Sequence, residues 1–266
     1  MANVDSSIQS HYGSDGLTQR ILAALEDAGT DLSNPTAETF FLADQLHGGG
    51  LKSTEFQAEL AGVASDTRVL DAGCGIGGAA RFLADHFGCD VDAIDLVEEF
   101  VDAAKQLTAL CGLDAKIRYR QGSVTDLPYP DQSFDLVWSQ NVTMNIEDKP
   151  RMFAEVHRVL APGGRFTLSH AVEGSAGGPY FPLPWAREPH YSFLGTEEMF
   201  LGMLEVAGFN IAELRYEGGA AGTSAMPPPA ISAVMGPDFP ERAENVRRSA
   251  QDGRIKGLLL VAERPA

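Results

Sequence analysis

One glycine-rich segment limits the possible folds of this 266-residue chain more than any other feature. Residues 67–78 read Thr-Arg-Val-Leu-Asp-Ala-Gly-Cys-Gly-Ile-Gly-Gly, and the helix-forming run 79–84 follows. An apolar strand therefore leads into an acid, then a glycine loop, then a helix. Glycine has no Cβ, so a ligand can approach the bare backbone of such a loop. The segment predicts a strand–loop–helix unit that binds a ligand.

Two cofactors fit the glycine spacing. Gly73, Gly75 and Gly78 satisfy G-x-G-x-x-G, and Asp95 lies about 20 residues further on, as a dinucleotide site such as one for NAD requires. Asp71, directly before the loop, favours S-adenosylmethionine (SAM) instead. Its carboxylate would repel a pyrophosphate, whereas SAM has no phosphate and presents an ammonium and a sulfonium. A purely structural glycine turn is the remaining alternative.

Composition limits the class of protein. With 44% apolar residues the chain can bury a full core. Its three cysteines, Cys74, Cys89 and Cys111, are an odd number without metal-ligand spacing, so we expect a reduced, cytoplasmic protein with no metal site. Residues 1–10 have neither a basic nor an apolar run, and no segment approaches the ~20 apolar residues of a membrane span. We therefore expect neither a secretory signal nor a membrane span.

The formal charge of −17 indicates a strongly acidic surface. Such a field repels phosphate backbones, so we expect no nucleic-acid partner. It would attract cations, and both SAM and an amine substrate qualify. The alternative is that the acidic surface mainly confers solubility.

Strands and helices alternate from Val69 onward, which predicts a Rossmann-like doubly wound α/β sheet of seven strands. Polar residues punctuate the apolar strand patterns, which lie at 68–72, 91–95, 116–121, 134–139, 165–170, 211–216 and 257–263. Helices are expected at 78–87, 97–111 and 150–160, and from a Thr196 cap through Ala207 with Met199 on its buried face. The last two strands predict a C-terminal antiparallel hairpin. The stretch 218–240 receives no assignment.

Three regions are predicted from this pattern. Residues 1–66 read as an N-terminal helical cap or lid, broken at the glycine run 48–50. Residues 67–266 form the cofactor-binding domain. Within it, the Pro- and Gly-rich segment 171–200 follows the fifth strand as an insert that would cover the substrate.

Four of the predicted strands end in polar residues, at the edge where a doubly wound sheet binds its ligand. The first ends in Asp71 and the glycine loop. The second ends in Asp95, placed to accept both ribose hydroxyls or else to cap the next helix. The third ends in 122–126, able to line an adenine. The fourth ends in 138–145, rich in amides where a methyl acceptor would arrive.

Several segments carry a family resemblance: 73–84, 86–89, 122–123, 127–128, 133–135, 138–140 and 158–164. On these residues the chain resembles the class I SAM-dependent methyltransferases. More narrowly, it is similar to the small-molecule N-methyltransferases that act on sarcosine and dimethylglycine.

The resemblance implies methyl transfer to a small amine or amino acid such as sarcosine or dimethylglycine, with S-adenosylhomocysteine (SAH) as the product. C- or O-methylation of a quinone or other aromatic metabolite is the alternative. An NAD-dependent oxidoreductase and a non-catalytic SAM-binding protein are lesser ones. A monomer and a homodimer are both open. The expected cofactor-binding residues are Asp71, Ala72, Gly73, Gly75, Gly77, Asp95, Leu96, Ser123, Val124 and Gln140.

Candidate catalytic residues follow from the reaction. Transfer from a sulfonium is an in-line displacement, so the protein must hold the reactants in line and exclude water, and a phenol would in addition want a base. His170, at the end of the fifth strand, is either that base or a structural hydrogen-bond partner. His47 and Tyr12 could close over the cofactor, or lie on the surface. Asn145 completes this set.

Candidate substrate residues lie after the fourth and fifth strands. Asn141 is one of the amides at the end of the fourth strand. Trp185, in the insert, could enclose an amine by cation–π contact, and Arg187 could hold a carboxylate. The alternative is that the aromatic residues of the insert pack on the core or on a dimer partner.

Overall fold

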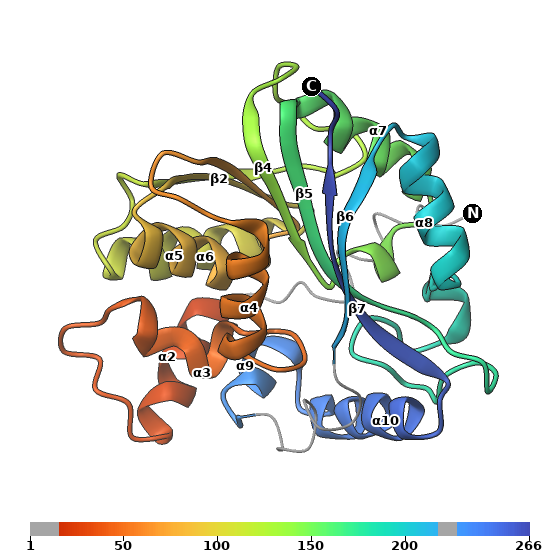
Figure 1. Cartoon of the computed structure of the whole chain (residues 1–266). Helices are drawn as coiled ribbons and strands as arrows, with labels where there is room; N and C mark the ends of the chain where they lie inside the picture. The colour runs from red at the N-terminus through yellow and green to blue at the C-terminus, as the bar shows by residue number, and fades with distance from the viewer. Residues whose placement is uncertain (1–15, 218–227) are drawn as a thin grey trace.

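A seven-stranded sheet forms the centre of the molecule in the computed structural model, which describes residues 16–217 and 228–266. The strand order is β3-β2-β1-β4-β5-β7-β6 (Figure 1). The strands are β1 Arg68–Ala72, β2 Asp90–Asp95, β3 Ile117–Gln121, β4 Phe134–Gln140, β5 Leu160–Glu173, β6 Asn210–Glu217 and β7 Ile255–Glu263. The first five pair in parallel, and β7 pairs antiparallel with both β5 and β6. The predicted fold class, including the C-terminal hairpin, is confirmed.

Helices cover both faces of the sheet, with α4, α5 and α6 on one side and α7 and α8 on the other (Figure 1). The helices and short 3₁₀ turns are α2 Leu17–Asp27, η1 Ala37–Phe40, α3 Phe41–Asp44, α4 Leu51–Ala61, α5 Gly78–Phe87, α6 Glu98–Leu110, η2 Thr143–Asn145, α7 Lys149–Val159, η3 Pro189–Tyr191, α8 Glu197–Val206, α9 Ile231–Met235 and α10 Phe239–Gln251. Among the described residues, every helix is too short or too polar to cross a bilayer.

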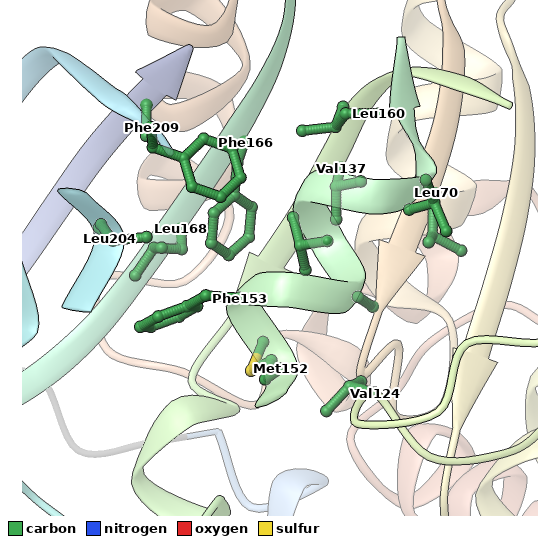
Figure 2. Close-up of a cluster of buried hydrophobic side chains, with 14 of the residues drawn as sticks. Leu70, Val124, Val137, Met152, Phe153, Leu160, Phe166, Leu168, Leu204 and Phe209 are labelled. Carbon is green, nitrogen blue, oxygen red and sulfur yellow. The ribbon is translucent and has the colours of Figure 1, made fainter. Parts of the chain in front are cut away.

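Side chains of the central strands point alternately to the two faces of the sheet, and each face has its own hydrophobic core. On β1, Val69 packs toward α4 and α5, whereas Leu70 packs toward α7. Figure 2 shows the second of these cores, in which Phe153 of α7 and Phe166 of β5 are fully buried. Each buried side chain of this size contributes about 1.5–3 kcal/mol. These two cores fix the strand ends on which the site is built.

A third core joins the N-terminal helices to α6 and α9. Leu25 of α2, Phe40 of η1, Phe100 of α6 and Val234 of α9 bury their side chains together. The N-terminal helices and α9 therefore pack on the same edge of the sheet, below α5 and α6 in Figure 1.

Three details differ from the sequence-based expectations. Helix α10 lies mostly after the stretch 218–240, which received no assignment. It was not predicted, because its buried face contains polar side chains such as Arg242 and Asn245 instead of a continuous apolar stripe. The predicted burial of Met199 is wrong: its side chain is 59% exposed, because the buried face of α8 runs through Phe200 and Leu204. Within the region predicted as a helical cap, residues 37–44 form the 3₁₀ turn η1 followed by the short helix α3 instead of one continuous helix.

Candidate active site

A cavity of about 340 Å³ opens at the carboxyl ends of β1, β2, β3 and β4. The N-terminal helices and α9 complete its wall. Eleven predicted site residues line it: Asp71, Gly73, Gly75, Asp95, Leu96, Ser123, Val124, Gln140, Asn141, Asn145 and His47.

The glycine loop is tied to the end of β2. The backbone N–H groups of Gly73 and Cys74 both donate to the carbonyl oxygen of Ile94, at 2.8 and 3.0 Å. Gly73 has φ +88°, and a Cβ there would lie 2.3 Å from Cγ2 of Val142. Only glycine fits this position, because the loop passes directly under the segment that follows β4.

Asp95 holds the start of α6 by a hydrogen bond, which corresponds to one of the two roles considered from the sequence. One carboxylate oxygen accepts from the Gly75 N–H at 2.8 Å, and the other accepts from the Val97 N–H at 2.9 Å, at the start of α6. Burial raises the pKa of Asp95, and these N–H groups oppose that rise. A carboxylate oxygen has more than one lone pair, so both remain able to accept ribose hydroxyls.

Asp71 has a buried oxygen with no hydrogen-bond partner among the described residues. Its side chain is 2% exposed and borders the cavity. Burial, and then the neighbouring carboxylate of Asp95, raise the pKa of Asp71 to about 8. An unsatisfied buried carboxyl is costly, and a bound ammonium would satisfy it. The residues present therefore fit SAM, whose ammonium can take that place.

A fully buried ion pair holds the N-terminal cap against the glycine loop. Arg81 of α5 donates to Asp44 of α3 at 2.8 Å, and both side chains have no exposed area. Arg81 also donates to the Ile76 carbonyl oxygen at 2.9 Å, inside the loop. On the other side, a Cβ on Gly78 would lie 2.5 Å from the Asp44 carbonyl oxygen. The cap and the loop are therefore in direct contact.

A polar network that was not predicted surrounds His47. Thr54 of α4 donates to Gln45 at 2.9 Å and lies 3.1 Å from Nε2 of His47. Gln140, at the end of β4, donates to Thr54 at 3.4 Å and accepts from the Trp138 indole at 3.2 Å. Burial lowers the pKa of His47, which favours its neutral form. No signal in the sequence pointed to this network, because Gln45 and Thr54 are buried in the structure but lie among other polar residues, such as Asp44 and Glu55, in the sequence.

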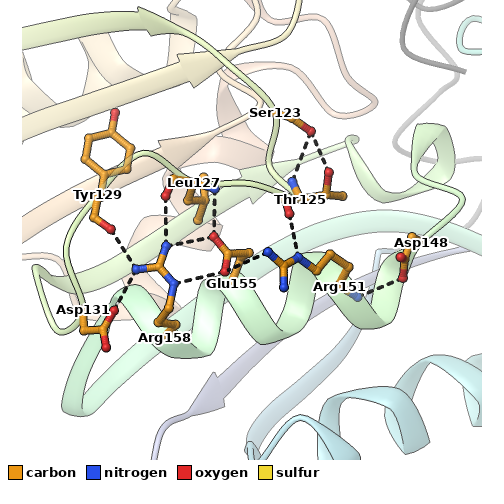
Figure 3. Close-up of polar contacts among 9 residues, drawn as sticks. All are labelled: Ser123, Thr125, Leu127, Tyr129, Asp131, Asp148, Arg151, Glu155 and Arg158. Carbon is orange, nitrogen blue, oxygen red and sulfur yellow. Dashed lines mark hydrogen bonds and ion pairs between the residues drawn. The ribbon is translucent and has the colours of Figure 1, made fainter. Parts of the chain in front are cut away.

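The segment after β3 is held on α7 by arginines, as Figure 3 shows. Arg158 donates to the carbonyl oxygens of Leu127 and Tyr129, at 2.9 and 2.8 Å. Arg151 donates to the carbonyl oxygen of Thr125 at 3.0 Å. The Thr125 hydroxyl lies 2.8 Å from that of Ser123, a predicted adenine contact. These contacts fix the part of the cavity wall expected to face the adenine.

His170 lies outside the cavity. It is 2% exposed, with Nδ1 2.7 Å from the Thr143 hydroxyl of η2 and its ring against Phe200. Burial, and then the nearby charge of Lys149, lower the pKa of His170 to about 3. A neutral imidazole in this position supports η2 and does not contact the cavity. This position fits the role of a structural hydrogen-bond partner, which was the alternative considered from the sequence.

Two candidate substrate residues of the insert are also outside the cavity. Trp185 is 9% exposed, packs in a small core with Met144 of η2, and donates to Ser192 at 2.9 Å. Arg187 forms an ion pair with Asp238, close to the start of α10. The insert therefore packs its aromatic side chain inward, and α10, which was not predicted, supplies the partner of its arginine.

The remaining predicted residues support the loop or lie beyond the described part. Ala72 is fully buried, and its carbonyl oxygen accepts from Ser139 at 3.0 Å. Gly77 precedes α5 as its N-cap with φ +82°. Tyr12 lies outside the described residues.

Several lining residues were not predicted, and two of them come from elements that only tertiary packing brings to the site. The largest apolar ones are Leu46, Phe100, Val142, Ile146 and Met235. Leu46 follows α3 and Met235 ends α9, so segments far apart in the sequence both contribute to this wall. A local sequence pattern carries no signal for such a meeting.

Comparisons with known proteins agree with this arrangement. The methyltransferase domain family matches residues 70–168. A sarcosine/dimethylglycine N-methyltransferase of Halorhodospira halochloris is 34% identical over 152 residues, 57% of this chain and 54% of that protein. A chloroplastic tocopherol O-methyltransferase of Arabidopsis thaliana is 32% identical over 139 residues, 52% of this chain and 38% of that protein. The chain thus matches about half, or less, of the length of these curated relatives.

Among solved structures, the fold is shared by the geranyl diphosphate C-methyltransferase of Streptomyces coelicolor A3(2). The two chains superpose with a TM-score of 0.72 and 19% identity, over 99% of each chain. This likeness concerns the fold.

The domain match and the sheet order together show that this chain carries a class I SAM-dependent methyltransferase domain. The predicted enzyme class and its cofactor are thereby confirmed, and SAM is favoured over the dinucleotide alternative. The three proteins compared above are named for transfer to nitrogen, oxygen and carbon, so the fold leaves the acceptor atom open.

Proposed function

We propose that this chain transfers the methyl group of SAM to a small amine bound in the cavity described above. The observation that carries the proposal is the glycine-loop cavity bordered by Asp71, with its buried and unpartnered carboxylate oxygen. The relative named for sarcosine and dimethylglycine supports nitrogen as the acceptor atom, and these two amines are the first acceptors to test.

The chain's own residues would bind and orient the two reactants. SAM, when bound, supplies an electrophilic methyl group on its sulfonium. Asp71 would hold the ammonium, Asp95 the ribose hydroxyls, and Ser123 with Val124 the adenine. Asn141 and Asn145, whose side chains are half-buried at the cavity wall, would orient the acceptor. Positioning of this kind accounts for most of what a displacement at a methyl group needs.

Water exclusion would come from the cap and from α9. Leu46 and Met235 close the wall with apolar side chains, and the Asp44–Arg81 pair keeps the cap against the glycine loop. An amine with a free lone pair needs no base, so no protein group has to accept a proton before the methyl group moves.

Methylation of an aromatic oxygen or carbon is a second candidate. The apolar wall formed by Leu46, Phe100, Val142, Ile146 and Met235 would suit a ring, and a relative is named for tocopherol. His47, kept neutral by burial at the cavity wall, could take the phenol proton.

The first experiment is a calorimetric titration of the protein with SAH, and with NAD in parallel. We expect saturable binding of SAH alone, weakened at least tenfold in Asp95→Ala. Labelled SAM would then be offered with sarcosine, dimethylglycine, 2-(methylamino)ethanol and a set of catechols. Binding of NAD instead of SAH would overturn the proposal, and SAH binding without methylation of any acceptor would favour a non-catalytic SAM-binding protein.

A further inference from the structure

Among the described residues that line the cavity, the charged side chains all have the same sign. They are Asp44, Asp71, Asp95, Glu147 and Asp148, and all are carboxyl groups. Asp44 is neutralised by Arg81, and both oxygens of Asp95 accept backbone N–H groups. Asp71 keeps a bare buried oxygen, and Glu147 brings an exposed carboxylate to the rim.

The basic side chains near this wall are engaged elsewhere. Lys149, directly after Asp148, is buried and donates to the carbonyl oxygens of Ile146 and Phe193. Arg151 is held by the Thr125 carbonyl oxygen, and Arg187 by Asp238. The sequences of residues 1–15 and 218–227, which the structure does not describe, contain neither lysine nor arginine.

The cavity therefore offers a poor place for an anion. A carboxylate or phosphate entering an apolar wall needs a cation or several hydrogen-bond donors. Beside the part of the wall that SAM would occupy, it would find the amides of Asn141 and Asn145 but no cation among the described lining residues, and it would meet the carboxylate of Glu147. SAM is compatible with this negative electrostatic field, because its two positive groups, the sulfonium and the ammonium, outnumber its one carboxylate and give it a net positive charge. The apolar side chains Val142, Ile146 and Met235 complete a surface that accepts uncharged or positively charged groups.

We propose that the methyl acceptor carries no carboxylate, phosphate or other anionic group, and enters the cavity as a neutral molecule or a cation. This inference rests on the proposed function and narrows it. Among small amines, it excludes amino acids such as sarcosine and favours amino alcohols and similar amines without an acidic group.

The test compares acceptors in matched pairs that differ only in the anionic group. One pair is sarcosine and 2-(methylamino)ethanol, and the second is 3,4-dihydroxybenzoate and 3,4-dihydroxybenzyl alcohol. Initial rates are measured with labelled SAM. We expect the uncharged or cationic member of a methylated pair to have a kcat/KM at least tenfold higher. Equal or better use of the carboxylated member would overturn the proposal.

A charge-reversal variant gives an independent check. Glu147→Lys places a cation at the rim and should reduce the discrimination within a pair several-fold, with the dissociation constant of SAH changed less than twofold. Asp114→Lys makes the same change of net charge at an exposed position outside the cavity and should leave the discrimination unchanged. An equal effect of both variants would mean that the overall field, and not this cavity, selects the acceptor, and would contradict the proposal.

A binding measurement distinguishes failure of the proposed function from failure of the charge inference. The four compounds are also titrated into the SAH complex, so the charge preference is read from dissociation constants without turnover. Tighter binding of the carboxylated members overturns the charge inference, whereas binding without any methyl transfer overturns the proposed function.

Discussion

At the scale of single residues, two buried titratable side chains differ in their position, because one lines the cavity and the other lies outside it. Asp71 borders the cavity with a bare oxygen, and its pKa is raised to about 8. His170 supports η2 from outside the cavity, and its pKa is lowered to about 3. Both shifts arise first from burial, which disfavours the charged form of either group.

Asp71 should make the ligand-free protein less stable at alkaline pH. The unfolded carboxyl ionises near pH 3.9 but the folded one near 8, so between these values the folded state binds the extra proton and stability falls as pH rises. Asp71→Asn should remove this dependence, raising the Tm at pH 8 by about 2–4 °C per kcal/mol recovered and changing it less at pH 5. The same variant should bind SAH at least tenfold more weakly. An equal shift of Tm at both pH values would contradict the assignment.

His170 should remain neutral wherever the enzyme works. The unfolded imidazole takes up a proton below about pH 6.5 and the folded one only near 3, so stability is lost as pH falls between these values. The Cε1 proton resonance of His170, assigned by its loss in His170→Asn, should keep a constant shift from pH 5 to 8. A titration midpoint inside that range would restore His170 as a candidate base.

At the scale of elements, the site depends on how the cap, the glycine loop and the segment after β4 are joined. The Asp44–Arg81 pair links α3 to α5, and Gly73 brings the loop against Val142. Both contacts join segments distant in sequence, and both are buried. Changes here should therefore alter binding together with stability.

Arg81→Met should destabilise the protein by about 3–5 kcal/mol, because it leaves the Asp44 carboxyl buried without its cation. Urea unfolding measures the loss, and the double variant Asp44→Leu/Arg81→Met should recover much of it. The pair Arg68–Asp135 is a matched control at a half-exposed position, where Arg68→Met should cost less than about 1 kcal/mol. A similar cost at both positions would contradict the role of the buried pair.

Gly73→Ala should abolish SAH binding, since its Cβ would lie 2.3 Å from Val142 at a φ of +88°. Gly88→Ala is the control: φ is also positive, at +74°, but nothing lies within 4 Å of the added atom, so we expect a loss of about 1 kcal/mol and normal binding. Calorimetry and urea unfolding separate the two effects. Normal SAH affinity in Gly73→Ala would show that the loop can move away from Val142.

Local patterns predicted the elements that carry their own signal. β1 was predicted at its observed bounds, because an apolar run ends there in an acid and glycines, and α5 follows directly. Asp95, Ser123 and Asn145 reach the cavity because parallel strands end at one edge. α10 could not be predicted, because its buried side chains include the polar residues Arg242 and Asn245. These two side chains donate hydrogen bonds to carbonyl oxygens of the insert, and a local sequence pattern does not show such contacts. For the same reason the direction of Trp185 and Arg187 was not predictable.

At the scale of the whole molecule, the charge of −17 sets the response to salt. Like charges repel more strongly in the compact state, and salt screens them over a Debye length of about 10 Å at 0.1 M. We expect the Tm to rise by roughly 2–4 °C between 20 mM and 500 mM NaCl, which corresponds to about 1 kcal/mol. KCl should act equally, since screening depends on ionic strength. A Tm that falls with salt would indicate that the ion pairs of the surface outweigh the repulsion.

The position of β7 has a consequence for how the chain is made. β7 is inserted between β5 and β6, so an interior strand of the sheet is synthesised after both of its neighbours. Until then, β6 lacks its hydrogen-bonding partner and the edge of β5 is open to pairing with other chains. This half of the sheet is thus completed by an interior strand, and the nascent chain needs protection from aggregation until β7 has been inserted.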